Sequence, residues 1–456
     1  MIRTILKKEL YDNFMSFRFF IALLLCCILI PTGIYINLQN YQKSTANFLE
    51  AKNLYEQSLN GKKTQNLVKA KGFREPSELA IFSNGVDEML PNYLSTDYYD
   101  GLILSAETYL DNPLSVLYGK IDFSFMVNIV MSLLAIVFTF NAVTGEKEEG
   151  TFKLIMSNSI DRWKILFSKI IGAFISISIP LIISILISLI IISLSGTFEL
   201  FKTDFLVKIG IILLISFIYV LVFINLGIFI STMTHKSLNS KLMLLFIWVL
   251  FVLAIPKLSS MLTDVIHPVK SRQVLNLEKR IAKDNLNRER GERLNDIWDD
   301  QENYDELRKP IAAEFAQREK QLMANMEQEY QNRKNNQTQL AKSLSRISPS
   351  SSFVLAISEL SNTGLSELDN FLRYTEQFSS AMEDDVYSVG YTDISEKGYR
   401  FSMGVIDLNN MPRFLYQKLD IQSILKHVWF DIILLILFNI LFFTGSYVRF
   451  LRYDVR

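Results

Sequence analysis

The chain has 456 residues, half of them hydrophobic, and its 47 basic and 47 acidic side chains give a formal net charge of zero. A mean hydropathy of +0.21 is higher than soluble proteins usually show and indicates several membrane spans. The cysteines are Cys26 and Cys27, adjacent in one apolar run, which excludes a disulfide framework and a cysteine zinc site. The three histidines are far apart in the sequence and no HExxH motif occurs, which excludes that type of metalloprotease.

Residues 1–16 form an amphipathic stretch that precedes the first apolar run. Ile2, Ile5 and Leu6 alternate with charged residues such as Lys7 and Lys8. Such a pattern is typical of a helix that lies at the membrane surface, with its apolar face among the lipids. We expect an interfacial helix here, in contact with membrane lipids on the cytoplasmic side.

Six apolar runs are long enough to cross a bilayer, for which a helix needs about 20 residues. They predict transmembrane helices at residues 17–38, 123–143, 166–194, 205–232, 242–262 and 429–450. The sequence therefore predicts an all-α polytopic membrane protein with six transmembrane helices.

Basic side chains are concentrated in four of the segments that flank these runs. They are Arg3, Lys7, Lys8 and Arg18 before the first run, Lys147, Lys153, Arg162, Lys164 and Lys169 after the second, Lys236 and Lys241 after the fourth, and Arg449, Arg452 and Arg456 after the sixth. In a six-span topology the four segments share one side, which the positive-inside rule assigns to the cytoplasm. We expect a membrane protein with both termini in the cytoplasm and residues 451–456 as a short tail.

Two long insertions then lie outside the membrane, and both are expected to be mainly helical. The first is residues 39–122, in which Tyr41, Phe48 and Tyr55 recur at seven-residue steps. This periodicity predicts that the first transmembrane helix continues outward until Gly61 ends it.

The second insertion is residues 263–428. An apolar stripe that includes Leu307, Ile311 and Phe315 predicts the second helix of a hairpin, with Pro310 in its first turn. Acidic and basic residues alternate over residues 270–334, which favours a solvated helix face over a nucleic-acid surface. Beyond the hairpin, a short helix is expected over residues 350–362, and the spacing of Ser366 and Asp369 predicts a capping box that opens another.

Residues 144–165 join the second and third spans and carry the most distinctive motif. Gly145 and Gly150 have the spacing of the glycines in a phosphate-binding P-loop, but Thr151 and Phe152 stand where that motif requires Lys and Ser or Thr. The chain therefore shows no ATP site of its own. The alternative that the loop is simply a solvated turn stays open.

The composition of this loop also predicts one short surface helix. Glu146, Glu148 and Glu149 would lie in its first turn, where acidic residues complement the helix dipole. Phe152 and Leu154, with Ile155 and Met156, would provide an apolar surface for the groove of a partner. The run Ser157-Asn158-Ser159 would end this helix, and Asp161 would cap the next one.

Polar residues inside the predicted spans give little sign of catalysis or ion transport. Asn128, Asn141, Asn225 and Asn439 are neutral amides that suit interhelical hydrogen bonds. Lys208, Lys257 and Asp431 lie near the predicted outer ends of spans, where snorkelling would explain them. No charge is expected in the middle of the membrane, which disfavours an ion relay and an intramembrane enzyme.

The loop between spans two and three resembles the signature of type-2 (ABC-2) ABC transporter permeases. Residues 140–154 read FNAVTGEKEEGTFKL and residues 157–169 read SNSIDRWKILFSK. The family pattern is an acidic E-x-E-x-G-T segment, a small-polar turn with an arginine, and a lysine that opens the next span. The proline that usually precedes the arginine is absent, and Ser159 and Ile160 stand there. The large insertion and the ISPSSSF segment at 347–353 resemble a subgroup with a big extracytoplasmic helical domain before the last span.

This resemblance implies a non-catalytic permease subunit of an ATP-driven exporter, which binds no cofactor itself. Two ABC ATPase subunits would bind ATP and Mg²⁺, and a second permease subunit, identical or homologous, would complete the complex. The resemblance also implies site residues. The coupling helix that docks on the ATPase would comprise Glu146, Lys147, Glu148, Glu149, Gly150, Thr151, Phe152, Lys153 and Leu154, followed by Asp161, Arg162 and Lys164 in the loop to the third span. Residues 1–16 would be the family's elbow helix.

A second hypothesis concerns the insertions. The chain could serve as a membrane scaffold or mechanical transmitter whose external helical domain recruits an extracytoplasmic protein. Removal of the charged hairpin would separate the two hypotheses, because a transport path confined to the spans would survive it.

Overall fold

The computed structural model describes residues 2–59, 64–66, 71–87, 93–97, 101–104, 121–157, 161–197, 203–297, 304–389, 405–407 and 413–452. The chain forms two compact units. One consists of Met1–Thr108, Ser115–Pro256 and Arg346–Arg456, and the other of Tyr109–Leu114 and Lys257–Ser345.

Six helices in the described part of the chain are long and apolar enough to cross a membrane. They are Phe17–Leu59, Phe123–Glu148, Arg162–Leu194, Asp204–Met233, Ser237–Ile266 and Ile421–Leu451. The prediction of an all-α polytopic membrane protein is confirmed. The first of these helices, α2, runs without a break to Leu59, as the seven-residue periodicity predicts, whereas Gly61 lies outside the described residues.

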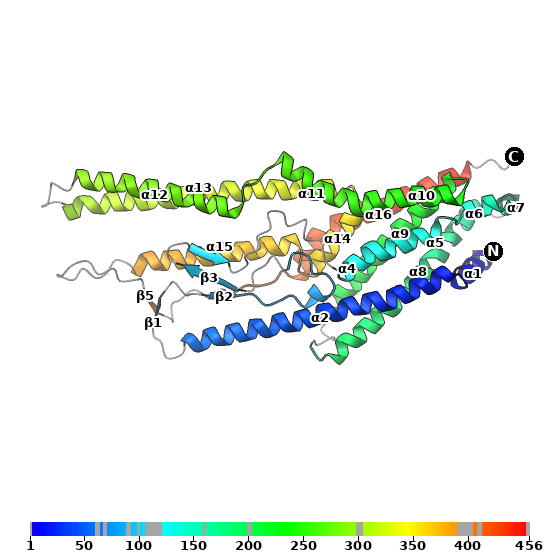
Figure 1. Ribbon diagram of the computed structural model, residues 1–456, viewed down its shortest axis with the longest axis horizontal. Helices are drawn as coiled ribbons and strands as arrows, with labels where there is room; N and C mark the ends of the chain where they lie inside the picture. Colours follow the sequence, from blue (N-terminus) through cyan, green and yellow to red (C-terminus); the bar gives the residue numbers. More distant parts are fainter. Residues whose placement is uncertain are drawn as a thin grey trace. The chain divides into compact units, whose positions relative to one another are not determined.

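Helix α9 (Thr203–Met233) is the centre of the membrane bundle in the first unit. It packs against α16 (Ile421–Leu451), α5 (Ser132–Thr139) and α8 (Arg162–Leu194), and α8 in turn packs against α1 (Ile2–Phe14) and α2 (Figure 1). Gly227 lets α9 approach α5, because a Cβ there would lie 1.8 Å from Oγ1 of Thr139. Small residues at such contacts are how membrane helices pack closely.

The second and fifth membrane helices each contain a π-helical segment, η4 (Met126–Met131) and η5 (Val249–Ala254). The polar groups of both segments bind a short helix, α14 (Pro349–Leu360). The Ser350 hydroxyl donates to Oδ1 of Asn128 at 2.7 Å, and the Ser348 hydroxyl donates to the carbonyl of Phe251. Tyr219 also donates to Oδ1 of Asn128, at 2.7 Å.

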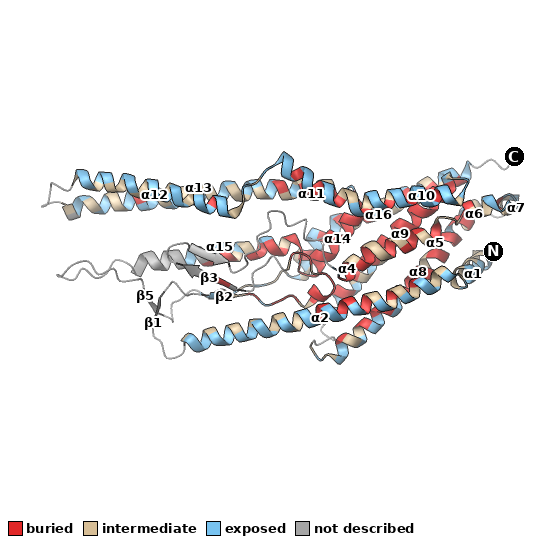
Figure 2. Ribbon diagram, viewed as in Figure 1, coloured by how far each residue is buried: buried red, intermediate tan, exposed pale blue. Residues whose placement is uncertain are grey.

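All twelve residues of α14 are buried, mainly against α16 and α9, and Figure 2 shows the helix as a buried stretch. The sequence predicts a short helix here, as part of the second insertion, but not its burial within the bundle. The burial depends on residues far away in the sequence, such as Asn128, which accepts the hydrogen bond of Ser350.

Short strands are an addition that the sequence did not predict. Strand β1 (Thr64–Asn66) pairs antiparallel with β5 (Val405–Asp407), so that segments of the two insertions meet. Strands β2 (Lys71–Phe73), β3 (Tyr93–Asp97) and β4 (Gly101–Leu104) form an antiparallel sheet in the order β2-β3-β4. A 3-10 helix, η2 (Glu78–Ile81), follows β2 in the sequence and precedes β3, and most of its residues are buried.

Helix α15 (Leu365–Val389) follows α14, but the predicted capping box is wrong. The helix begins at Leu365, and the backbone N–H of Ser366 donates to Oε1 of Glu359 at 3.2 Å. Thus a carboxylate from the preceding helix accepts this hydrogen bond, a role that the predicted capping box gives to Asp369.

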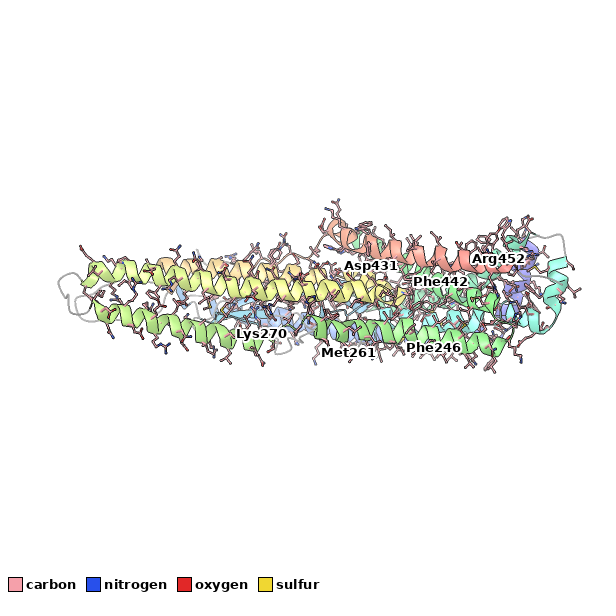
Figure 3. The ribbon with its side chains drawn as sticks, turned by 90° about the horizontal axis from the view of Figure 1, so that it is seen from above. Phe246, Met261, Lys270, Asp431, Phe442 and Arg452 are labelled. Atoms are coloured by element: carbon pink, nitrogen blue, oxygen red, sulfur yellow. The ribbon has the colours of Figure 1, made fainter. Side chains whose placement is uncertain are left out.

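The second unit contains the predicted antiparallel hairpin, formed by α12 (Arg272–Asp296) and α13 (Tyr304–Ser345). The placement of Pro310 in the first turn of the second helix is wrong, because α13 begins six residues earlier, at Tyr304. Most residues of both helices are exposed or half-exposed. Figure 3 shows their side chains projecting from the two helices.

An ion-pair cluster joins the two helices of this hairpin and makes its stability depend on pH. Arg272 lies 2.5 Å and Lys279 2.6 Å from carboxylate oxygens of Glu327. Partial burial opposes ionisation of Glu327, but Arg272 and Lys279 outweigh it and lower its pKa to about 2. A lowered folded-state pKa gives stability that is present above the ordinary glutamate pKa of 4.5 and is lost as the pH falls toward about 2.

We therefore expect Glu327→Gln to speed amide hydrogen exchange in α12 and α13 at neutral pH. The difference from wild type should shrink as the pH falls through this window and should be lost only below about pH 2, where Glu327 becomes mostly protonated. The matched control is Glu289→Gln, whose ion pair with Arg318 is about half exposed and should contribute little. A pH-independent difference for Glu327→Gln would contradict the assignment.

Candidate functional site

The loop between the second and third membrane helices contains two short helices, α6 (Thr144–Glu148) and α7 (Thr151–Ser157). The prediction of one helix with the acidic residues in its first turn is wrong. Gly150 has a φ of +73° and separates the two, a conformation that glycine adopts readily and other residues rarely do. Glu146 and Glu148 thus belong to the end of the second membrane helix, and the helix that follows begins at Thr151.

Lys169 is the buried centre of this site. Its ammonium group lies 2.6 Å from Oε1 of Glu146 and 2.9 Å from Oε1 of Glu9, and its side chain is only 4% exposed. The three residues connect α6, α8 and α1. Helix α1 can lie this close because residue 172 is glycine; a Cβ there would be 2.9 Å from Cβ of Glu9. The sequence marked Lys169 as basic but gave no sign of its partners.

Two other residues of α6 attach it to the turn between α9 and α10 (Ser237–Trp248). The Lys147 ammonium donates to the carbonyls of Thr232 at 2.7 Å and Thr234 at 2.9 Å. The Glu148 carboxylate accepts hydrogen bonds from the backbone N–H and the hydroxyl of Ser237. Two predicted docking residues therefore hold the loop to the fourth and fifth membrane helices.

Phe152 attaches α7 to the last membrane helix. It is 1% exposed, and its ring centroid lies 5.6 Å from that of Phe450 in an edge-to-face contact. The prediction that Phe152 belongs to an exposed docking surface is therefore wrong. Arg162 strengthens the same contact, because its guanidinium donates to the carbonyl of Leu451 at 2.6 Å.

The outward side of the loop carries a smaller set of the predicted residues. Glu149, Gly150 and Lys153 are exposed, and Leu154 is 68% exposed. Thr151 is half-buried, and its hydroxyl donates to the carbonyl of Glu146 at 3.3 Å. Among these five residues, Leu154 is the one large apolar side chain, and the others are polar or glycine.

Asp161 and Lys164 lie at the start of α8. Asp161 occupies the N-cap position as predicted, but its side chain makes no capping hydrogen bond and forms an ion pair with Lys164 instead. Residues 158–160, where the predicted break falls, lie outside the described residues.

A second buried ion pair lies in the N-terminal half of α16. Asp431 is 1% exposed and accepts two hydrogen bonds from the Arg346 guanidinium, at 2.7 and 2.8 Å. Lys208 is 8% exposed and donates to Oδ1 of Asn362 at 3.0 Å. Snorkelling toward water is therefore the wrong explanation for Asp431 and Lys208, because protein groups bind both of them.

Nothing in the described part of the chain groups three histidine, cysteine or acidic side chains closely enough to hold a metal ion. The site is instead a junction of helix ends. Ion pairs, hydrogen bonds and one aromatic contact join the α6–α7 loop to α1, α8, α9, α10 and α16.

Six helices among the described residues are long and apolar enough to cross a membrane, and this loop joins the second to the third, so the fold is that of a polytopic membrane protein. Residues 3–455 match the family described as ABC-2 family transporter protein, and the chain belongs to that family. A comparison with curated proteins gave no match. Membership of this family makes the chain a permease component of an ABC transporter, and association with ABC ATPase subunits is a property of the family in general.

Proposed function

We propose that partner ABC ATPases drive this permease by docking on the exposed side of α7 and of the α6–α7 turn. The observation that carries the proposal is the division of the loop into two sides. Lys147, Glu148 and Phe152 are bound by the membrane helices, whereas Lys153 and Leu154 are exposed. A leucine exposed amid charged residues is the composition of a small docking surface, in which one apolar anchor carries much of the affinity.

The contacts of the loop suggest how a push would spread. A displacement of α7 would reach α16 through Phe152 and Phe450, and a displacement of α6 would reach α8 and α1 through Lys169. The proposed coupling thus involves more than the second and third spans. In this proposal the loop and both termini face the cytoplasm of a bacterium, ATP and Mg²⁺ bind to the partner ATPases, and the chain pairs with a second permease subunit as an exporter.

Leu154→Asp is expected to reduce co-purification with the ATPase, and permease-dependent ATP hydrolysis, by about tenfold or more. The loss follows from placing a charge where an apolar anchor enters a partner's groove. Both measurements use the complex expressed from its own genes and reconstituted in lipid.

The matched control is Leu194→Asp. Leu194 is 83% exposed and ends the third membrane helix, on the side predicted to be external. Its replacement should leave ATPase binding unchanged. Normal binding by Leu154→Asp, or an equal loss in Leu194→Asp, would refute docking at α7.

A scaffold function remains the second candidate because the α12–α13 hairpin belongs to a compact unit of its own. Residues 273–326 can be replaced by a short Gly/Ser linker, since the side chains of Arg272 and Glu327 meet across the hairpin, with Nη1 and Oε1 2.5 Å apart, and the two backbones are therefore no further apart than these side chains reach. Survival of export in this deletion would assign transport to the membrane helices alone. Loss of export with normal ATPase binding would favour a function that requires the hairpin.

A further inference from the structure

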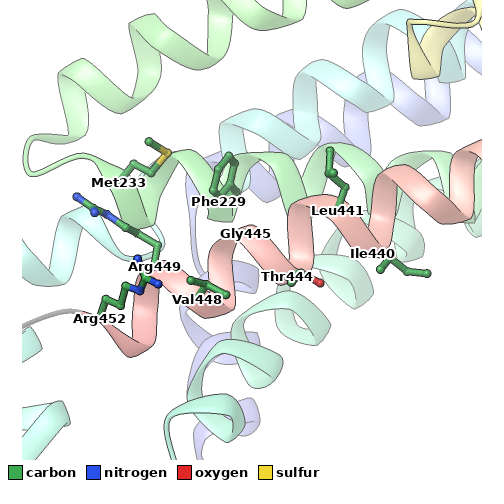
Figure 4. Close-up of a pocket in the computed structure, with 9 residues that line it drawn as sticks. All are labelled: Phe229, Met233, Ile440, Leu441, Thr444, Gly445, Val448, Arg449 and Arg452. Carbon is green, nitrogen blue, oxygen red and sulfur yellow. The ribbon is translucent and has the colours of Figure 1, made fainter.

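A groove lies between α9 and the C-terminal half of α16, with a volume of about 540 Å³ (Figure 4). Its wall consists mostly of apolar side chains of both helices, among them Phe229, Ile440 and Leu441. Ile440 is 58% and Leu441 60% exposed. The groove therefore presents an apolar surface, of a size that ligand sites commonly have, on the outside of the described bundle.

Gly445 shapes the floor of the groove. A Cβ at this position would lie 2.8 Å from Cε2 of Phe229, so only glycine lets that ring lie directly against the backbone of α16. The convex surface expected of two packed helices becomes a hollow at this point.

One end of the groove is strongly basic. Arg449 and Arg452 line it near Met233, as Figure 4 shows. Among the described residues, none of the ion pairs involves either arginine. Lys147 adds a positive charge next to this end, since its ammonium binds the carbonyls on both sides of Met233.

We propose that this groove binds an anionic glycerophospholipid. One acyl chain would lie along Phe229, Ile440 and Leu441, and the phosphate would accept hydrogen bonds from Arg449 and Arg452. An apolar hollow that ends in paired arginines complements a lipid that has a chain and a charged headgroup, and basic pockets between membrane helices bind such headgroups. With both termini in the cytoplasm, as the proposed function has them, this lipid belongs to the inner leaflet. The binding itself does not depend on that orientation.

The test measures lipid retention by the purified chain in detergent, by native mass spectrometry, with phosphatidylglycerol and phosphatidylcholine of identical acyl chains in equal amounts. Wild type is expected to retain phosphatidylglycerol about tenfold better, a preference in keeping with two arginines at a headgroup. Arg449→Gln/Arg452→Gln should abolish this preference. The control Arg3→Gln/Lys7→Gln removes two positive charges that do not line the groove and should leave the preference intact.

Three results would overturn the proposal. The first is equal retention of the two lipids by wild type, which no folding defect of a variant can explain. The second is displacement of phosphatidylglycerol by equimolar glycerol phosphate, which would show that the arginines bind a free phosphate without the groove. The third is a disulfide-linked dimer of Ile440→Cys in membranes, in a Cys26→Ser/Cys27→Ser background, which would assign the groove to a second copy of the chain. ATPase docking plays no part in any of these measurements, so their failure leaves the proposed function standing.

Discussion

Lys169→Met is expected to destabilise the protein by about 3–5 kcal/mol, because it leaves two carboxylates in a buried site without their counter-ion. The Lys169 side chain is 4% exposed, and those of Glu9 and Glu146 are 19% and 16% exposed. Water cannot readily replace the lost ammonium group at such a site. The measurement is thermal unfolding of the purified permease in detergent, with the yield of folded protein as a second readout.

Two further variants decide what the result means. Lys164→Met removes a lysine whose ion pair with Asp161 is largely exposed, and it should cost less than about 1 kcal/mol. The triple variant Glu9→Met/Glu146→Met/Lys169→Met should restore most of the stability, since a buried charge cluster can often be replaced by apolar packing. Wild-type stability of Lys169→Met alone would refute the contribution assigned to this cluster.

The triple variant also shows whether the three charges only hold the helices together or also rearrange during the ATPase cycle. If the three charges connect the loop to α1 and α8 only by holding them together, apolar packing will restore permease-dependent ATP hydrolysis along with stability. If the ion pairs rearrange during the cycle, stability will return while ATP hydrolysis stays low. In such a rearrangement Lys169 would exchange one ion-pair partner for the other, since the carboxylates of Glu9 and Glu146 both lie within 3 Å of its ammonium group.

The membrane helices could be predicted from sequence because their signal is local. Each span is a run of apolar residues, and a run such as residues 429–450 predicts a membrane helix without reference to any other part of the sequence. The continuation of the first helix to Leu59 is likewise encoded by a repeat within one segment. Family membership followed from the loop motif, which is also a short contiguous stretch.

The candidate site was predictable only in outline, because its geometry depends on distant partners. Phe152 and Leu154 look alike in the sequence, two apolar residues of one charged loop. Phe152 is buried because its ring packs against Phe450, about 300 residues away, whereas Leu154 is left exposed. The break at Gly150 had a local signal, since glycine commonly stands just after the last residue of a helix, and that signal was outweighed by the expectation of a continuous coupling helix.

The buried charges show the same limit more sharply. Asp431 near the start of a span suggested a side chain that reaches for water, which is the commoner situation for an isolated charge at a helix end. Its partner Arg346 comes 85 residues earlier, in a segment that no local pattern links to α16. Pairing of this kind is a property of the tertiary structure.

Arg346→Gln is therefore expected to destabilise the protein by about 3 kcal/mol, because Asp431 would keep its charge in a buried position with an uncharged neighbour. The Arg346 guanidinium binds both oxygens of Asp431 and lies 4.9 Å from the centroid of the Phe430 ring. The Arg346→Gln variant therefore loses two directional hydrogen bonds and a cation–π contact. Thermal unfolding measures the total cost. Hydrogen exchange of the α14 amides measures whether the destabilisation is local to this helix, since Arg346 lies just before its first residue, Pro349.

The control is Arg318→Gln in α13, which removes an arginine of similar chemistry from the exposed ion pair with Glu289 and should change stability by less than about 1 kcal/mol. Arg346→Leu/Asp431→Leu removes both charges and should recover much of the loss. Helix α14 is buried against α9 and α16. Faster exchange confined to α14 would therefore show that the ion pair holds this helix in place within the bundle. Uniformly faster exchange in α9, α14 and α16 would show that the pair stabilises the bundle as a whole, and unchanged exchange would remove it from either role.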